Sequence, residues 1–209
     1  TTAHTLSLHD ALPISKNWSE KGYLMQNFPY LEQKNGGWVW NFPKSLNMAT
    51  QVCDFWEIKS PEKICIKDFT DVDLPVLYSY KDLRKFSDSL AFELRNRGVG
   101  KGDRVGVLLS QEIGCAASHI AIWKLGAISI PLFKLFGPEA LATRLNDANA
   151  KYTITDDEGS ENLLPPEFDR LIFNNIVLKN DAFQTCVTSP ESPAVLIYTS
   201  GTTGPPKGA

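Results

Sequence analysis

The clearest hydrophobic pattern lies in the middle of the chain. Leu83, Phe86, Leu90 and Leu94 recur at intervals of three or four residues, which places their side chains on one face of a helix. Gly98 follows, as expected where such a helix ends. We therefore predict an amphipathic helix. Its solvated face is expected to carry the charged residues Arg84, Lys85, Asp88, Glu93 and Arg95.

Strands and helices alternate after this helix. The apolar run Val105–Leu109 predicts a strand covered on both faces. Helical patterns over residues 112–125 and 137–148 then alternate with short strand patterns over residues 127–130 and 152–155. Such alternation is typical of right-handed βαβ units, so the fold class predicted is α/β with a parallel sheet.

The segments around this core have weaker patterns. Residues 46–60 predict a helix that ends at Ser60-Pro61, and residues 64–66 and 76–80 predict two short strands. Residues 156–166 are polar and end in two prolines, which indicates a surface loop.

Three regions are expected along the chain. Residues 1–15 show no period and precede no recognisable element, so we expect a non-native or disordered extension. Residues 16–45 mix aromatic residues with Gly, Pro and Asn, which favours irregular chain anchored by its aromatic side chains. Residues 46–209 hold the predicted domain.

Composition excludes some classes of protein. The chain is 43% hydrophobic and 22% charged, with a formal net charge of −3, so a packed core is expected and nucleic acid is disfavoured as a partner. No apolar run approaches the roughly 20 residues of a membrane span, and the start lacks the pattern of a secretory signal. We therefore expect a cytoplasmic protein. The four cysteines form no C-x-x-C pair, which favours free thiols.

The most informative chemistry follows the apolar run Ala194–Tyr198, which predicts a buried strand. The next residues read TSGTTGPPKG. Glycine amides, hydroxyl groups and one ammonium group are the donors that proteins use to hold phosphates. Lys207 is followed by Gly208 and not by Ser or Thr, so the segment is not the phosphate loop of P-loop NTPases. It is also not the G-x-G-x-x-G of a dinucleotide fold.

The string YTSGTTGPPKG resembles the phosphate-loop signature of the adenylate-forming superfamily, which includes acyl-CoA synthetases, luciferases and peptide-synthetase adenylation domains. Residues 78–83 (YSYKDL) and 123–127 (WKLGA) resemble two further signatures of that superfamily, in the same order. Residues 47–57, 98–109 and 131–141 are most similar to short- and medium-chain acyl-CoA synthetases.

The resemblance implies that a carboxylic acid is activated with ATP and Mg²⁺ and then transferred to coenzyme A. It implies that this chain is the first part of the large N-terminal domain, with the main catalytic residues beyond Ala209. Two alternatives stay open: a carrier-protein-loading adenylation domain, and an inactive piece that binds nucleotide weakly. Carried over by position, the residues that contact ATP are Thr199, Ser200, Gly201, Thr202, Thr203, Gly204 and Lys207.

Four other features have a chemical and a structural interpretation. For His119 and Cys115 we favour packed side chains over catalytic ones, because neither has a chemical partner nearby in sequence. For Trp38 and Trp40 we favour anchoring of the N-terminal segment over stacking on a nucleotide. For residues 156–158 (DDE) we favour a solvated acidic loop over a cation site.

Overall fold

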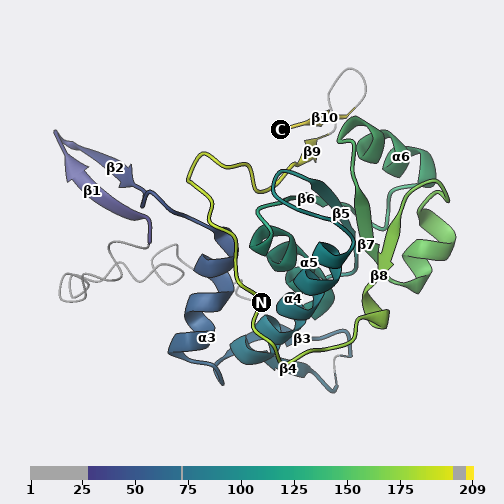
Figure 1. The fold of residues 1–209 in the computed structure, drawn as a ribbon, viewed down its shortest axis with the longest axis horizontal. Coiled ribbons are helices and arrows are strands. Elements are labelled where there is room, and N and C mark those ends of the chain that lie inside the picture. Colours follow the sequence, from purple (N-terminus) through teal and green to yellow (C-terminus); the bar gives the residue numbers. More distant parts are fainter. Residues whose placement is uncertain (1–27, 72, 200–205) are drawn as a thin grey trace.

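A four-stranded parallel sheet forms the centre of the fold. The computed structural model describes residues 28–71, 73–199 and 206–209. In sheet order, the strands are β6 (Ile128–Pro131), β5 (Arg104–Leu108), β7 (Tyr152–Thr155) and β8 (Arg170–Ile172). Every neighbouring pair is parallel. The predicted α/β fold class is thereby confirmed (Figure 1).

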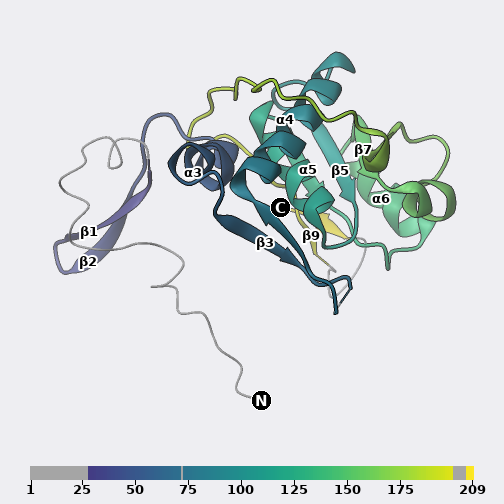
Figure 2. The ribbon, with the colours of Figure 1, turned by 90° about the horizontal axis from the view of Figure 1, so that it is seen from below.

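Helices cover both faces of this sheet. Helices α4 (Tyr80–Asn96) and α5 (Ile113–Lys124) pack on the face that carries Val105 and Val107. Helix α6 (Pro138–Asp147) packs on the opposite face, over a cluster that includes Leu108. Side chains of a strand alternate between its faces, so β5 serves both clusters and needs to be apolar throughout. Figures 1 and 2 show α6 on the other side of the sheet from α4 and α5.

The helix predicted from Leu83 to Leu94 is confirmed as α4. Its first turn is closed by a capping box, in which the Asp82 amide donates to Ser79 Oγ over 3.2 Å and the Ser79 amide donates to Asp82 Oδ2 over 2.8 Å. The chain leaves the helix at Gly98, whose φ of +80° favours glycine. One assignment on its outer face was wrong: Asp88 is buried.

The helix predicted over residues 46–60 is also present. It contains a π-helical turn, η2 (Thr50–Asp54), followed by α3 (Phe55–Lys59), and it buries Ala49 and Cys53 completely. The two strands predicted next form an antiparallel hairpin of β3 (Ile64–Asp68) and β4 (Val76–Ser79).

Two segments differ from the sequence prediction. Residues 156–166, expected to be a loop, contain a helical turn, η3 (Gly159–Leu163), which begins where the Gly159 amide donates to Asp156 Oδ1 over 2.8 Å. A short 3₁₀ turn, η4 (Phe173–Asn175), follows β8. The second difference is in the N-terminal segment.

That segment forms a β-hairpin where irregular chain was expected. Strands β1 (Tyr30–Lys34) and β2 (Gly37–Asn41) pair around Asn35-Gly36, both of which have positive φ. Trp38 is 68% exposed and Trp40 is 47% exposed, so the predicted anchoring on a core is not what these rings do. The hairpin projects away from the sheet in both views (Figure 2). Residues 1–15, predicted to be an extension, and residues 16–27 lie outside the described residues.

No helix of the described residues combines the length and apolar character that crossing a membrane requires. The four cysteines are free thiols, as the sequence predicted.

Candidate functional site

The ends of the glycine-rich segment meet in a two-stranded hairpin. Strand β9 (Tyr198–Thr199) pairs antiparallel with β10 (Lys207–Gly208), and Lys207 lies opposite Thr199. Two backbone hydrogen bonds between Ile197 and Ala209, of 2.9 and 3.0 Å, extend the pairing. The structure therefore brings together Thr199 and Lys207. The other predicted site residues lie outside the described residues: Ser200, Gly201, Thr202, Thr203 and Gly204.

The hairpin is connected to the central sheet beside β6. Val195 forms an isolated parallel bridge with Ser129, supported by a 2.9 Å hydrogen bond from the Ser129 amide to the Ala194 carbonyl and another from the Leu196 amide to the Ser129 carbonyl. Because the bridge is parallel, the chain continues from Val195 toward the carboxyl edge of the sheet. Ligands of open α/β sheets bind at that edge.

The strand that precedes the hairpin is less buried than predicted. The apolar run Ala194–Tyr198 predicts a buried strand, but only Val195 bridges to β6 and Ile197 is 53% exposed. Within the described residues, Val195 pairs with β6, whereas Ile197 pairs with Ala209 at the end of the hairpin. An apolar run alone does not show how completely a strand is covered.

Lys207 is an exposed cation beside this edge. Lys207 is exposed in β10, and no carboxylate of the described residues forms an ion pair with its ammonium group. Thr199 is exposed directly across the hairpin. An ammonium group and a hydroxyl group at a strand end are donors for an anionic oxygen. The two described site residues thus have the chemistry of a phosphate contact.

The packed interpretations of His119 and Cys115 agree with the structure. The His119 ring lies 5.8 Å from that of Trp123, and burial lowers the pKa of His119 to about 4. Burial also raises the pKa of the Cys115 thiol, and that residue packs against the apolar cluster of α4 and α5. A low-pKa imidazole without a charged partner and a protonated thiol are poor catalytic groups.

Two carboxylates of the acidic run at residues 156–158 pair with a lysine. Lys134 Nζ lies 2.6 Å from Asp156 Oδ2 and 2.7 Å from Glu158 Oε2. In the part of the chain that the structure describes, no three His, Cys, Asp or Glu side chains form a group that could hold a metal ion. The described residues therefore contain no cluster of three such side chains for Mg²⁺.

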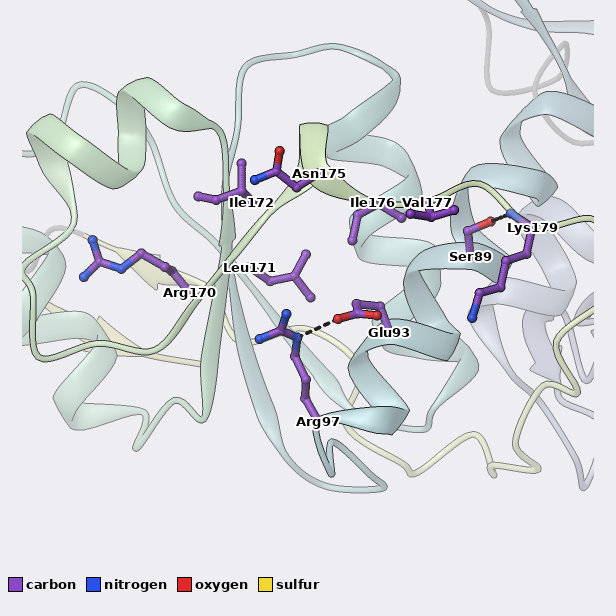
Figure 3. Close-up of a pocket in the computed structure, with 10 residues that line it drawn as sticks. All are labelled: Ser89, Glu93, Arg97, Arg170, Leu171, Ile172, Asn175, Ile176, Val177 and Lys179. Atoms are coloured by element: carbon purple, nitrogen blue, oxygen red, sulfur yellow. Dashed lines mark hydrogen bonds and ion pairs between the residues drawn. The ribbon is translucent and has the colours of Figure 1, made fainter.

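A cavity of about 220 Å³ lies at the opposite edge of the sheet, between α4 and β8. Two of its cations already have partners: Arg97 pairs with Glu93, which also lines the cavity, at 2.9 Å, and the Arg170 guanidinium donates to the carbonyls of Ser160 and Pro165. Figure 3 shows Arg170 and Lys179 pointing away from one another, so they do not converge on one ligand. We do not assign this cavity to the functional site.

The structure adds a contact that sequence reasoning missed. The Tyr198 hydroxyl donates to Asp147 Oδ2, at the end of α6, over 2.6 Å. The two residues are 51 positions apart, and no local pattern in the sequence connects them.

Comparison with known proteins identifies the family. Residues 56–209 match the family described as AMP-binding enzyme. The chain is 30% identical over 155 residues to a probable non-canonical nonribosomal peptide synthetase, CymA, of Salinispora arenicola (strain CNS-205), and this match covers 71% of the chain and 2% of that protein. It is 31% identical over 166 residues to an acetyl-coenzyme A synthetase of Helicobacter pylori (strain G27), covering 62% of the chain and 25% of that protein.

A solved structure has the same fold. The acyl-CoA synthetase of Brucella canis superimposes with a TM-score of 0.67 at 23% identity, over 80% of this chain and 33% of that one. The chain thus spans a third or less of the length of each of these three proteins. The glycine-rich hairpin at the end of the chain falls inside the matched region, and this chain belongs to the AMP-binding family of adenylate-forming enzymes.

Proposed function

We propose that this chain is the N-terminal part of an ATP-dependent acyl-CoA synthetase that acts on a short- or medium-chain carboxylic acid. The observation that carries the proposal is the β9–β10 hairpin, which sets Thr199 opposite Lys207 at the carboxyl edge of a parallel sheet. The family match and the acetyl-coenzyme A synthetase relative support it. Since ATP and coenzyme A would be its co-substrates, we place the enzyme in the cytoplasm as part of the same proposal.

The proposed reaction has two steps. A carboxylate oxygen attacks the α-phosphorus of ATP, and the bond from that phosphorus to pyrophosphate breaks. The thiol of coenzyme A then attacks the acyl carbon, AMP leaves, and the thiol proton is released. Mg²⁺ would supply charge neutralisation on the phosphates when bound.

The role proposed for the glycine-rich segment is electrostatic. Negative charge grows on the departing pyrophosphate, and donors held in place beforehand lower the barrier without reorganising. Lys207 would supply the positive charge and Thr199 a hydroxyl donor at the ends of the segment. We propose hydroxyl and amide donors to the phosphates from the residues between them: Ser200, Gly201, Thr202, Thr203 and Gly204.

Carboxylate-dependent ATP–pyrophosphate exchange tests the proposal. The assay is run on this chain and on the protein that the same reading frame encodes beyond Ala209, with a panel of short and medium acids. We expect exchange in the longer protein and none in this chain alone. A folded longer protein without exchange for any acid would contradict the proposal and favour a nucleotide-binding protein without catalysis.

Lys207→Ala in the longer protein tests the assigned role of the lysine. Loss of one donor aimed at developing charge lowers exchange by about a hundredfold. Lys67→Ala is the matched control, because Lys67 is also an exposed lysine in a strand of a two-stranded hairpin. Equal activity of the two variants would rule out a phosphate contact by Lys207.

A carrier-protein-loading adenylation domain is the second candidate, because the nonribosomal peptide synthetase relative covers 71% of the chain. Both candidates perform the exchange reaction, so exchange does not separate them. Adding coenzyme A separates the two candidates. An acyl-CoA synthetase then releases an acyl-CoA thioester, whereas a carrier-loading domain retains the adenylate until a carrier protein is added.

A further inference from the structure

A hydrogen bond between Tyr198 and Asp147 connects strand β9 of the candidate site to helix α6. Tyr198 is the first residue of β9, and Asp147 is the last residue of α6. The Tyr198 hydroxyl donates to Asp147 Oδ2 over 2.6 Å. A hydrogen bond to an ionised acceptor is stronger than one between neutral groups. This contact therefore fixes the position of β9 relative to the helix.

The ring of Tyr198 is held by packing as well as by its hydroxyl. It lies against the apolar cluster of α6, which contains Leu141 and Leu145. It also covers Gly208, its partner across the hairpin: a Cβ atom built at Gly208 would lie 3.1 Å from Tyr198 Cζ and 3.0 Å from Leu196 Cδ1. Glycine at 208 lets β10 approach the ring closely. Both strands are thus fixed by one aromatic side chain.

The electrostatics of α6 explain why Asp147 needs a donor. The carboxyl end of a helix carries partial negative charge, so a carboxylate there is disfavoured unless it is compensated. The Tyr198 hydroxyl supplies that compensation. Desolvation and the bond to Asp147 raise the pKa of Tyr198 to about 12. The phenol therefore stays protonated, and stays a donor, at neutral pH.

We infer that Tyr198 and Asp147 form a latch that positions the β9–β10 hairpin, and with it Thr199 and Lys207, before nucleotide binds. This inference rests on the proposed function for its catalytic consequence, and on the hydrogen bond and the Gly208 contact for its structural part. Tyr198 acts here as a positioning residue. When a binding-competent arrangement is populated only part of the time, the apparent affinity for the ligand falls by that fraction, while the bound complex reacts as before.

The test uses Tyr198→Phe in the longer protein, with steady-state pyrophosphate exchange as one readout and hydrogen exchange of the β9–β10 amides as the other. Loss of one charge-assisted but partly exposed hydrogen bond raises the KM for ATP about fivefold and leaves kcat within about twofold. Hydrogen exchange at Ile197, whose amide donates to the Ala209 carbonyl, accelerates by a similar factor.

Three further variants separate the latch from general damage. Asp147→Ala has the same effects as Tyr198→Phe, and the double variant is no worse than either one, because both remove the same bond. Asp147→Asn retains an oxygen acceptor and restores most of the ATP affinity. Tyr152→Phe is the control, since within the described residues the Tyr152 hydroxyl makes no hydrogen bond to lose, and it leaves both readouts unchanged.

Several results would overturn the inference: additive effects in the double variant, an unchanged KM, or a loss confined to kcat. A wild-type protein that shows no exchange would contradict the proposed function. Hydrogen exchange then decides the latch alone, and unchanged protection at Ile197 in Tyr198→Phe would end it.

Discussion

Lys124 is the buried charge on which the packing of the helices depends most directly. Its side chain is fully buried in α5, where Nζ pairs with Asp54 and lies 2.7 Å from Asp88 Oδ1. Asp54 also accepts a hydrogen bond of 2.6 Å from the Thr185 hydroxyl, and Asp88 lies 3.4 Å from Arg84 Nε. One lysine therefore joins α5 to α4 and to the helical turn η2.

The change Lys124→Met keeps most of the volume and removes the charge. The variant leaves the carboxylates of Asp54 and Asp88 buried without the positive charge of Lys124. Removing one member of a buried ion pair costs about 3–5 kcal/mol. Because domains of this size are stable by about 5–15 kcal/mol, the variant loses a large part of its free energy of unfolding.

Urea unfolding at pH 7, followed by tryptophan fluorescence, measures this loss. Lys101→Met is the matched control, because Lys101 is exposed in a turn and its replacement changes stability by less than about 0.5 kcal/mol. Should Lys124→Met fail to fold, adding Asp54→Asn and Asp88→Asn restores folding, since the uncompensated charges are then gone. A midpoint for Lys124→Met equal to that of the control, at the same denaturant slope, would refute the reasoning.

Three other outcomes follow from the packing. Since burial lowers the pKa of His119 from 6.5 to about 4, the folded state holds the neutral ring, and stability is lost as pH falls from about 6.5 toward 4. The loss reaches about 3 kcal/mol relative to His119→Gln in paired urea titrations, and equal pH profiles would contradict it. Gly114→Ala lowers stability by a net of about 1 kcal/mol, because its Cβ would meet the Phe173 ring at 2.9 Å and the overlap outweighs the gain in helix propensity; a higher thermal midpoint would show that the ring moves aside. Ser79→Ala removes the capping box of α4 and costs about 1 kcal/mol by urea unfolding, whereas an unchanged midpoint would mean that the box adds nothing.

The sequence predicted those elements whose stability depends on local pattern. Helix α4 is an example, because its apolar spacing, its Ser79 cap and its Gly98 end agree with one another. The β1–β2 hairpin differs from the predicted irregular chain. Asn35-Gly36 is a strong turn signal, but aromatic residues among Gly, Pro and Asn also suit irregular chain, and the local pattern does not decide between the two.

The hydrophobic pattern of a single helix does not predict which charged residues are buried. The spacing of Asp88 along α4 places it on the outer face. Its carboxylate is nevertheless buried, because Lys124 of α5 forms an ion pair with it. A lysine in a helix with no other Lys, Arg, Asp or Glu, as in residues 113–124, is the sequence signal that an acidic partner lies nearby. Which acidic residue pairs with this lysine depends on how the two helices cross, and the residue spacing within one helix gives no information about that crossing.

In the candidate site, too, the sequence predicts the chemical groups but not the tertiary contacts that position them. Thr199 and Lys207 were predicted because glycine, hydroxyl and ammonium groups in one short segment suit a phosphate whatever surrounds them. The β9–β10 pairing holds these two residues opposite each other, and the Val195 bridge and the Tyr198 contact connect that pairing to the domain. Donors lower a reaction barrier only when they are in place before charge develops. The contact between Tyr198 and Asp147, which no local sequence pattern predicts, is the one that we infer keeps Thr199 and Lys207 in place before nucleotide binds.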